Sequence, residues 1–179
     1  MADGDLEGQH RHFGCWSWNA ETGMLLMRVR IEDPWCEGMM NIDSIIWPAD
    51  AKAACNHYLK FVIQVVETLG IIFPNTRPDP RAVAERYIDG EISDEEYGAE
   101  ACAWWELLEA AGEIRISRER SLLLVRLALC LLSATPDEAP RLGDHLSWFL
   151  EMLYFMGIDS REPHAMMSKY FAWRGPADG

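Results

Sequence analysis

The sequence predicts a mainly α-helical protein, a single-domain bundle of about five helices around a central apolar helix. The first observation is the stretch SRERSLLLVRLALCLLS over residues 117–133, in which every residue from Leu122 to Leu132 except Arg126 is apolar. A helix that is apolar on all sides has no face to turn toward water, so it belongs inside a helical protein. The second observation is that helix start and end signals punctuate the segments around it.

The central helix is expected to begin at Ser117, whose hydroxyl can cap the first turn, and to stop at Thr135-Pro136. Its apolar run is shorter than the roughly 20 residues that span a bilayer. A guanidinium at Arg126 must reach the surface or meet a carboxylate and backbone carbonyls. Arg126 therefore has two interpretations, a structural ion pair or a functional charge that reaches a pocket.

Composition limits the possible partners. The chain has 179 residues, 49% of them hydrophobic, which is enough for one domain with a real core. Its net charge of −13 argues against direct binding to nucleic acid and to anionic membranes, and favours a basic protein partner or simple solubility.

The five cysteines are widely spaced and no signal peptide is visible, so we expect reduced thiols and a cytoplasmic location.

We expect three parts along the chain. Residues 1–12 form a flexible N-terminal tail, residues 13–174 form the single helical domain, and residues 175–179 form a frayed C-terminal end. A turn signal, NAETG, separates FGCWSW from MLLMRVRI in residues 13–32. The apolar residues of the second half do not alternate cleanly, so a β-hairpin and a helix are both open. Residues 35–47 show no period and predict a loop with room for one helical turn.

Helix signals follow in order. Apolar residues recur at helical spacing over residues 49–69, with Pro48 at the start and a glycine at the end. After a connector with three prolines, Asp79-Pro80 predicts a short helix to Asp89, and the Ser93/Glu96 capping box opens a helix to about residue 111. Pro140 interrupts the start signal at Thr135-Pro136, so the next helix is expected over about residues 141–156, and the last over about residues 162–172.

The most informative feature is the stretch from Asp89 to Glu109, which contains eight carboxylates and no Lys or Arg. On a helical wheel its inward side holds Tyr97, Ala101, Trp104, Leu108 and Ala111, whereas the opposite side holds Glu95, Glu106, Glu109 and Glu113. Like charges at this spacing cost a few tenths of a kcal/mol per pair. The one-sided charge therefore indicates either a solvated surface or a face shaped for a basic partner.

Trp105 falls at the edge of the apolar side, where an aromatic ring can anchor a protein contact. The candidate partner-binding residues are therefore Asp94, Glu95, Glu96, Trp105, Glu106, Glu109 and Glu113.

Other chemistry is weakly signalled. His10, His12 and Cys15 are close in sequence, but their spacing is not that of a zinc module. His57, His145 and His164 stand alone and are expected at surface or boundary positions. The chain has no nucleophile elbow, phosphate-binding loop or metalloprotease motif. We expect no catalytic residue, metal or cofactor, although so acidic a chain could hold a carboxylate pair for acid–base chemistry.

The stretch ERYIDGEISDEEYGAEACAWWELLEAAG resembles a pattern in small helical immunity proteins of bacterial polymorphic-toxin systems. In that pattern a short helix ends in Gly, as at Gly90, and Ile-Ser-x-x-Glu-Tyr opens the next helix, as from Ile92 to Tyr97. The likeness covers about one sixth of the chain. The Trp-containing N-terminal region and the leucine-rich central helix depart from the alanine-rich helices of that pattern. The resemblance implies a cytosolic protein that binds a cognate toxin and covers its basic active site.

Three classes of function follow. The first hypothesis is a non-enzymatic inhibitor of a basic protein, namely an immunity protein against a toxin domain. The second is an acidic adaptor, or a nucleic-acid mimic that inhibits a DNA-binding enzyme. The third is a small enzyme or ligand-binding bundle, which a polar-lined pocket around Arg126 would favour.

Overall fold

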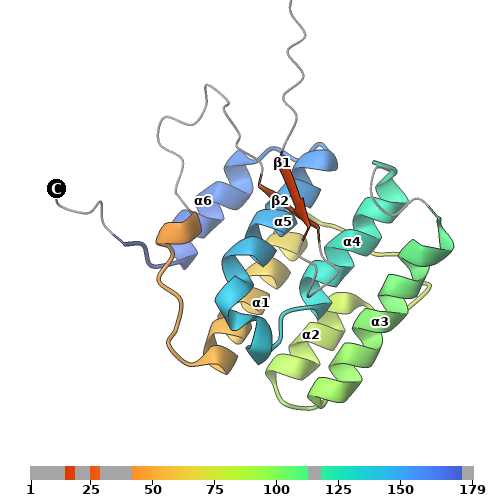
Figure 1. The fold of residues 1–179 in the computed structure, drawn as a ribbon, viewed down its shortest axis with the longest axis horizontal. Helices are drawn as coiled ribbons and strands as arrows, with labels where there is room; N and C mark the ends of the chain where they lie inside the picture. Colours follow the sequence, from red (N-terminus) through yellow and green to blue (C-terminus); the bar gives the residue numbers. More distant parts are fainter. Residues whose placement is uncertain (1–14, 19–24, 29–41, 113–117, 175–179) are drawn as a thin grey trace, which may run out of the picture. The chain divides into compact units, whose positions relative to one another are not determined.

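The computed structural model describes residues 15–18, 25–28, 42–112 and 118–174 (Figure 1). The chain divides into two units, residues 1–39 and residues 40–179, and each is described by itself. A single domain over residues 13–174 remains a prediction. The predicted tails at residues 1–12 and 175–179 lie outside the described residues.

In the first unit, strand β1 (Cys15–Trp18) pairs antiparallel with strand β2 (Leu25–Arg28). In this register Cys15 lies opposite Arg28 and Trp18 lies opposite Leu25. The turn predicted between the strands, at residues 19–24, is outside the described part, so the hairpin as a whole stays a prediction.

The described part of the second unit confirms the mainly α-helical fold class. Its helices are α1 (Ala51–Thr68), α2 (Pro80–Ile88), α3 (Asp94–Ala110), α4 (Arg120–Leu132), α5 (Leu142–Phe155) and α6 (Arg161–Tyr170), with 3-10 helices η1 (Ile42–Ser44) and η2 (Pro136–Arg141). Each α-helix corresponds to a segment predicted from capping and periodicity. The single turn η1 falls in the segment predicted to be mostly loop. None of the helices in the described ranges is long and apolar enough to cross a membrane.

Local chemistry explains the helix boundaries. Helix α1 begins at Ala51, three residues after Pro48, and Asp50 caps it, because the Asp50 carboxylate accepts a hydrogen bond from the Ala53 amide at 2.7 Å. Asp79 caps α2 and is followed by Pro80 at the first helical position, as predicted. Gly90 closes that helix at φ 75°, in the left-handed region that glycine adopts without strain.

The start of α4 differs from the prediction. The helix begins at Arg120 after Glu119, and no side chain caps it, whereas Ser117 was expected to do so and lies outside the described residues. Residues 118–121 are exposed, so water can satisfy the first amides of the helix without a side-chain cap. The Glu119 carboxylate instead accepts a hydrogen bond from the Ser121 hydroxyl at 2.8 Å.

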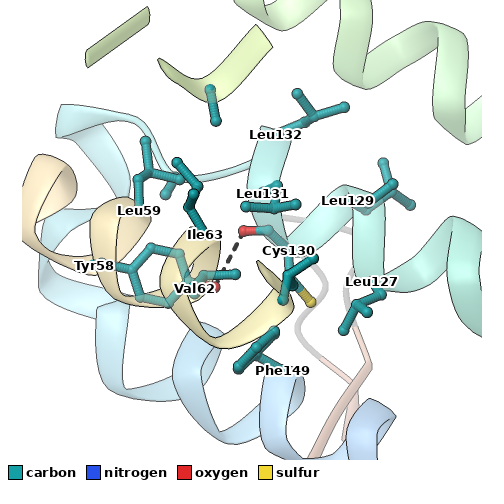
Figure 2. Close-up of a cluster of buried hydrophobic side chains, with 14 of the residues drawn as sticks. Tyr58, Leu59, Val62, Ile63, Leu127, Leu129, Cys130, Leu131, Leu132 and Phe149 are labelled. Carbon is teal, nitrogen blue, oxygen red and sulfur yellow. Dashed lines mark hydrogen bonds between the residues drawn. The ribbon is translucent and has the colours of Figure 1, made fainter. Parts of the chain in front are cut away.

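Helix α4 is the centre of the second unit. Helix α2 lies between α1 and α3, and α4 packs against all three, while α5 packs on α4 and α1 and α6 packs on α1 (Figure 1). Nine of the 13 residues of α4 are buried. Figure 2 shows how Leu127 and Leu131 of α4 meet Val62 of α1 and Phe149 of α5. A fully buried side chain of this size contributes about 1.5–3 kcal/mol relative to exposure. Helix α1 also buries nine residues, so α1 and α4 together supply much of the apolar core.

The C-terminal end of α4 is also buried, so its last backbone carbonyls need hydrogen-bond donors from the protein. The last four carbonyls of a helix have no partner within the helix. Tyr58 of α1 donates its hydroxyl to the Cys130 carbonyl at 3.1 Å, and Tyr97 of α3 donates to the Leu131 carbonyl at 2.6 Å (Figure 2 shows the first). Two neighbouring helices therefore supply the hydrogen bonds that water cannot.

The segments at the two ends of the second unit are tied together by backbone hydrogen bonds. Ile45 and Trp173 form an isolated antiparallel bridge, and the Ile46 amide donates to the Ala172 carbonyl at 2.8 Å. Phe171 is buried beside Trp47, with the two ring centroids 5.2 Å apart. Phe171, the first residue after α6, therefore packs as part of the core.

Candidate partner-binding face

Helix α3 carries most of the predicted partner-binding residues, and its start is fixed by the predicted capping box. The Ser93 hydroxyl accepts a hydrogen bond from the Glu96 amide at 3.2 Å, and the Glu96 carboxylate accepts one from the Ser93 amide at 2.8 Å. The backbone hydrogen bond from Ser93 is the main cause that lowers the pKa of Glu96. Carboxylates in the first turn also interact favourably with the positive end of the helix dipole.

The buried side of α3 determines which side faces outward. Tyr97, Trp104 and Leu108 are buried, and Ala101 is partly buried against the core. Four of the five residues predicted to point inward therefore do so. The fifth, Ala111, is exposed, because the helix ends at Ala110 and Ala111 serves only as its C-terminal cap.

Opposite this buried side lies an exposed surface that we call the α3 outer face, defined by Glu95, Cys102, Trp105, Glu106 and Glu109. The Trp105 side chain is 37% exposed, which places it at the boundary between the core and solvent, as its position on the wheel predicted. The seventh candidate residue, Glu113, lies outside the described residues.

Three of the candidate carboxylates already have partners. Asp94 accepts a hydrogen bond from the Tyr87 hydroxyl at 2.8 Å, and Glu96 serves the capping box. Glu106 forms an ion pair with Arg77 of the α1–α2 connector at 3.3 Å. Sequence reasoning missed Arg77 because it lies 29 residues away and carries no local signal.

Two carboxylates of the α3 outer face are different. Within the described part of the chain, Glu95 and Glu109 are exposed and make no hydrogen bond or ion pair. Arg86, the other nearby cation, pairs with Glu91 at 3.7 Å. The negative charge of this face is therefore reduced by Arg77 but not cancelled, and Glu95 and Glu109 are accessible to a partner.

Arg126 is buried, with only 8% of its surface exposed. Burial lowers the pKa of its guanidinium, and the nearby Glu151 carboxylate on α5 opposes that shift. Burial likewise raises the pKa of Glu151, whereas Arg118 and Arg126 lower it. This neighbourhood agrees with the interpretation of Arg126 as half of a structural charge pair.

A second polar cluster lies beneath η2. His145, predicted at a surface or boundary, is only 3% exposed, and its Nε2 lies 3.4 Å from the Glu138 carboxylate. Its burial follows from its place among Leu142, Leu146 and Phe149 on the apolar side of α5. Glu138 also accepts a hydrogen bond from Arg141 at 3.0 Å.

His57 lies at the flank of its helix, as expected. Its ring is stacked on the ring of Tyr170, with the two centroids 4.6 Å apart.

Cys55 lies close to this cluster but is not set up as a nucleophile. Its thiol donates a hydrogen bond to the Thr135 carbonyl at 3.0 Å. Burial, followed by the charges of Asp50 and Glu138, raises its pKa to about 11. The thiolate, which is the reactive form, is therefore strongly disfavoured at neutral pH.

Two shallow grooves lie on the surface of the described residues. One, of about 370 Å³, lies between the segment around Trp47 and helix η2, and its lining includes Pro48, Ala54, Pro136 and Pro140. The other lies between α1 and α2. Among the described residues no group of three or more His, Cys, Asp or Glu side chains could hold a metal ion. The predicted His10, His12 and Cys15 side chains fall outside that description.

Comparison of the chain with protein-family models, with curated proteins and with solved structures gives no match.

Proposed function

We propose that this chain is a cytoplasmic, non-enzymatic inhibitor that binds a basic protein through the α3 outer face. The protein class that this chemistry fits is an immunity protein, which neutralises a cognate toxin by covering a basic surface or active site. The observation that supports the proposal is that Glu95 and Glu109, two exposed carboxylates without a partner among the described residues, lie on the same side of α3 as the exposed Trp105.

The electrostatics favour recognition of a cation. Carboxylates on one side of a helix repel one another, and each like-charge pair costs a few tenths of a kcal/mol. A basic partner removes that repulsion and is attracted over a distance of about 8–10 Å at physiological ionic strength. Glu106 lies on the same face and is paired with Arg77. It can exchange Arg77 for a cation of the partner, because an exposed ion pair contributes only about 0–1 kcal/mol to stability.

Trp105 supplies the apolar part of the interface. Protein interfaces concentrate their binding energy in a few aromatic or arginine anchors, surrounded by polar contacts that exclude water. At 37% exposure Trp105 is already partly covered in the folded chain and still presents surface to a partner. Little side-chain entropy is therefore lost when a partner covers it.

The test is affinity capture from the native host with the full chain as bait, followed by mass spectrometry. The wild type is expected to retain a basic protein, and the triple variant Glu95→Gln, Glu106→Gln and Glu109→Gln is expected to lose it. Glutamine keeps the side-chain size and nearly the helix propensity of glutamate. The matched control is Arg77→Gln, which breaks the same ion pair while leaving the face more negative, and should retain the protein at least as well.

The identity of the captured protein separates the inhibitor classes. A toxin domain supports the immunity function, whereas a DNA-binding enzyme whose DNA competes with the chain supports the nucleic-acid mimic. Capture of the same basic protein by the wild type and the triple variant alike would move the binding site away from α3.

A further inference from the structure

The groove between α1 and α2 has an apolar floor. Ile63 of α1 is 7% exposed, and Ile88 of α2 is partly buried against the core. The groove encloses about 340 Å³, which is at the low end of the roughly 300–1,000 Å³ of ligand pockets. Its size suits one long side chain rather than a folded element.

The rim of this groove is charged. Glu67 contributes from α1, Glu85 contributes from α2, and Asp89 contributes from the C-cap position directly after α2, four residues beyond Glu85. Each of the three is exposed, and none forms a hydrogen bond or ion pair within the described residues. Lys60 is the only cation that lines the groove.

A further cation nearby is already engaged. The pKa of Arg81 is raised mainly by its hydrogen bond to Asp79 and to a smaller extent by the charges of Glu67 and Glu85. The Arg81 guanidinium donates its hydrogen bonds to Asp79, with Nε 3.0 Å from one carboxylate oxygen. Because Asp79 holds Arg81, the groove carboxylates keep an excess of negative charge above an apolar floor. A side chain that fits must be apolar along its stem and positive at its tip.

We propose that this groove binds an arginine side chain of the basic partner. Its methylene stem packs on Ile63 and Ile88, and its planar guanidinium donates to carboxylates of the rim. Arginine fits better than lysine because its guanidinium is more weakly hydrated and can donate two parallel hydrogen bonds to a carboxylate. This inference rests on the proposed function, which supplies the basic protein that carries the arginine. The groove itself is a surface separate from the α3 outer face.

The experiment uses the full chain with ¹³C-labelled isoleucine methyl groups and N-acetyl-arginine amide as the probe. Titration is expected to give saturable NMR shifts of the Ile63 and Ile88 methyl signals. N-acetyl-citrulline amide has nearly the same shape without the charge and is expected to give none. Equal shifts with citrulline, or no saturation with arginine, would overturn the proposal.

Variants locate the charge that is responsible. Glu85→Gln combined with Asp89→Asn should weaken binding of the arginine probe about tenfold. Lys60→Gln removes the cation of the rim and should strengthen binding. The matched control, Asp144→Asn with Glu162→Gln, removes two charges from α5 and α6 and should change binding less than about twofold. Circular dichroism verifies that each variant is folded, and equal weakening in the control would contradict a site in the groove.

The two proposals fail separately. Arginine binding in the groove, combined with unchanged partner capture by the α3 triple variant, would retain the groove and reject the α3 outer face. Loss of capture by the α3 variant, without any probe binding in the groove, would do the reverse.

Discussion

The hydroxyl of Tyr97 donates a hydrogen bond to the backbone carbonyl of Leu131 at 2.6 Å. This contact joins α3, which carries the proposed binding face, to the buried end of α4. It also orients α3, because the side that holds Tyr97 must face the core and the side that holds Glu95, Glu106 and Glu109 must then face solvent. The ring of Tyr97 is itself stacked on Tyr87, with centroids 3.9 Å apart.

Tyr97→Phe should reduce the free energy of unfolding by about 1–3 kcal/mol, because the buried Leu131 carbonyl loses its hydrogen-bond donor. Tyr154→Phe is the control, since that side chain is 66% exposed. Urea denaturation of both variants measures the difference. If Tyr97→Phe were as stable as the control, the hydrogen bond would contribute nothing to holding α3 on α4.

Leu127→Ala tests the central position of α4. Leu127 is fully buried, and truncation of a buried leucine costs about 2–5 kcal/mol through lost transfer energy and the cavity that remains. Ile72→Ala is the comparison, because Ile72 is 79% exposed and its truncation should change the free energy of unfolding by less than about 0.5 kcal/mol. Similar costs for the two substitutions would show that α4 is not the core helix.

Much of the fold could be predicted because its signals are local. Asp79-Pro80 and the Ser93/Glu96 capping box predict helix starts from residues at most three positions apart. The apolar run of α4, interrupted only by Arg126, predicts its own burial. The outward direction of Glu95, Glu106 and Glu109 likewise follows from helical periodicity alone.

What could not be predicted depends on contacts between distant segments. The Arg77–Glu106 ion pair spans 29 residues, and the Tyr58–Cys130 hydrogen bond spans 72. Neither has a pattern in the sequence, because each arises only after helices pack. His145 is different: a single histidine has no burial signal of its own, but its neighbours Leu142, Leu146 and Phe149 mark the apolar side of α5 on which it lies.

His145 should make the protein less stable in mild acid. Burial lowers the pKa of His145 from its ordinary value of 6.5, although Glu138 opposes this, so the folded state favours the neutral ring. The unfolded chain therefore binds a proton first, and stability that is fully present above pH 6.5 is lost as pH falls through the lower folded pKa. Free energies of unfolding measured from pH 8 to 5 should show this decline.

His145→Gln should flatten that decline, because glutamine does not titrate. Two other groups also affect the pH dependence: burial lowers the pKa of His57, and burial raises the pKa of Glu151 with the opposite effect on stability. Both are present in wild type and variant, so the difference between the two free energies of unfolding isolates His145. His164→Gln, on α6, is the control. A variant with the same pH dependence as the wild type would show that His145 does not titrate in this range.

The thiols should differ in reactivity. Cys102 is exposed on the α3 outer face, whereas Cys55 and Cys130 are buried and burial raises the pKa of both. In a Cys15→Ser and Cys36→Ser background, Ellman's reagent should modify one thiol rapidly and the other two only on unfolding. Cys102→Ser should abolish the rapid phase. Three thiols that react at one rate in the folded protein would contradict the packing of α1 and α4.

The last prediction separates charge from contact on the α3 outer face. In surface plasmon resonance with the captured partner, the triple variant Glu95→Gln, Glu106→Gln and Glu109→Gln should lower the association rate and reduce its dependence on salt, because long-range attraction acts mainly before contact. Trp105→Ala should instead raise the dissociation rate, because an anchoring ring acts only once the complex has formed. Tyr154→Ala, a change of similar size at an aromatic side chain on α5, should alter neither rate. Unchanged rates and an unchanged salt slope in both α3 variants would make this face a solvated surface, and the search for the binding site would then move to the Trp-rich N-terminal region around Trp16, Trp18 and Trp35.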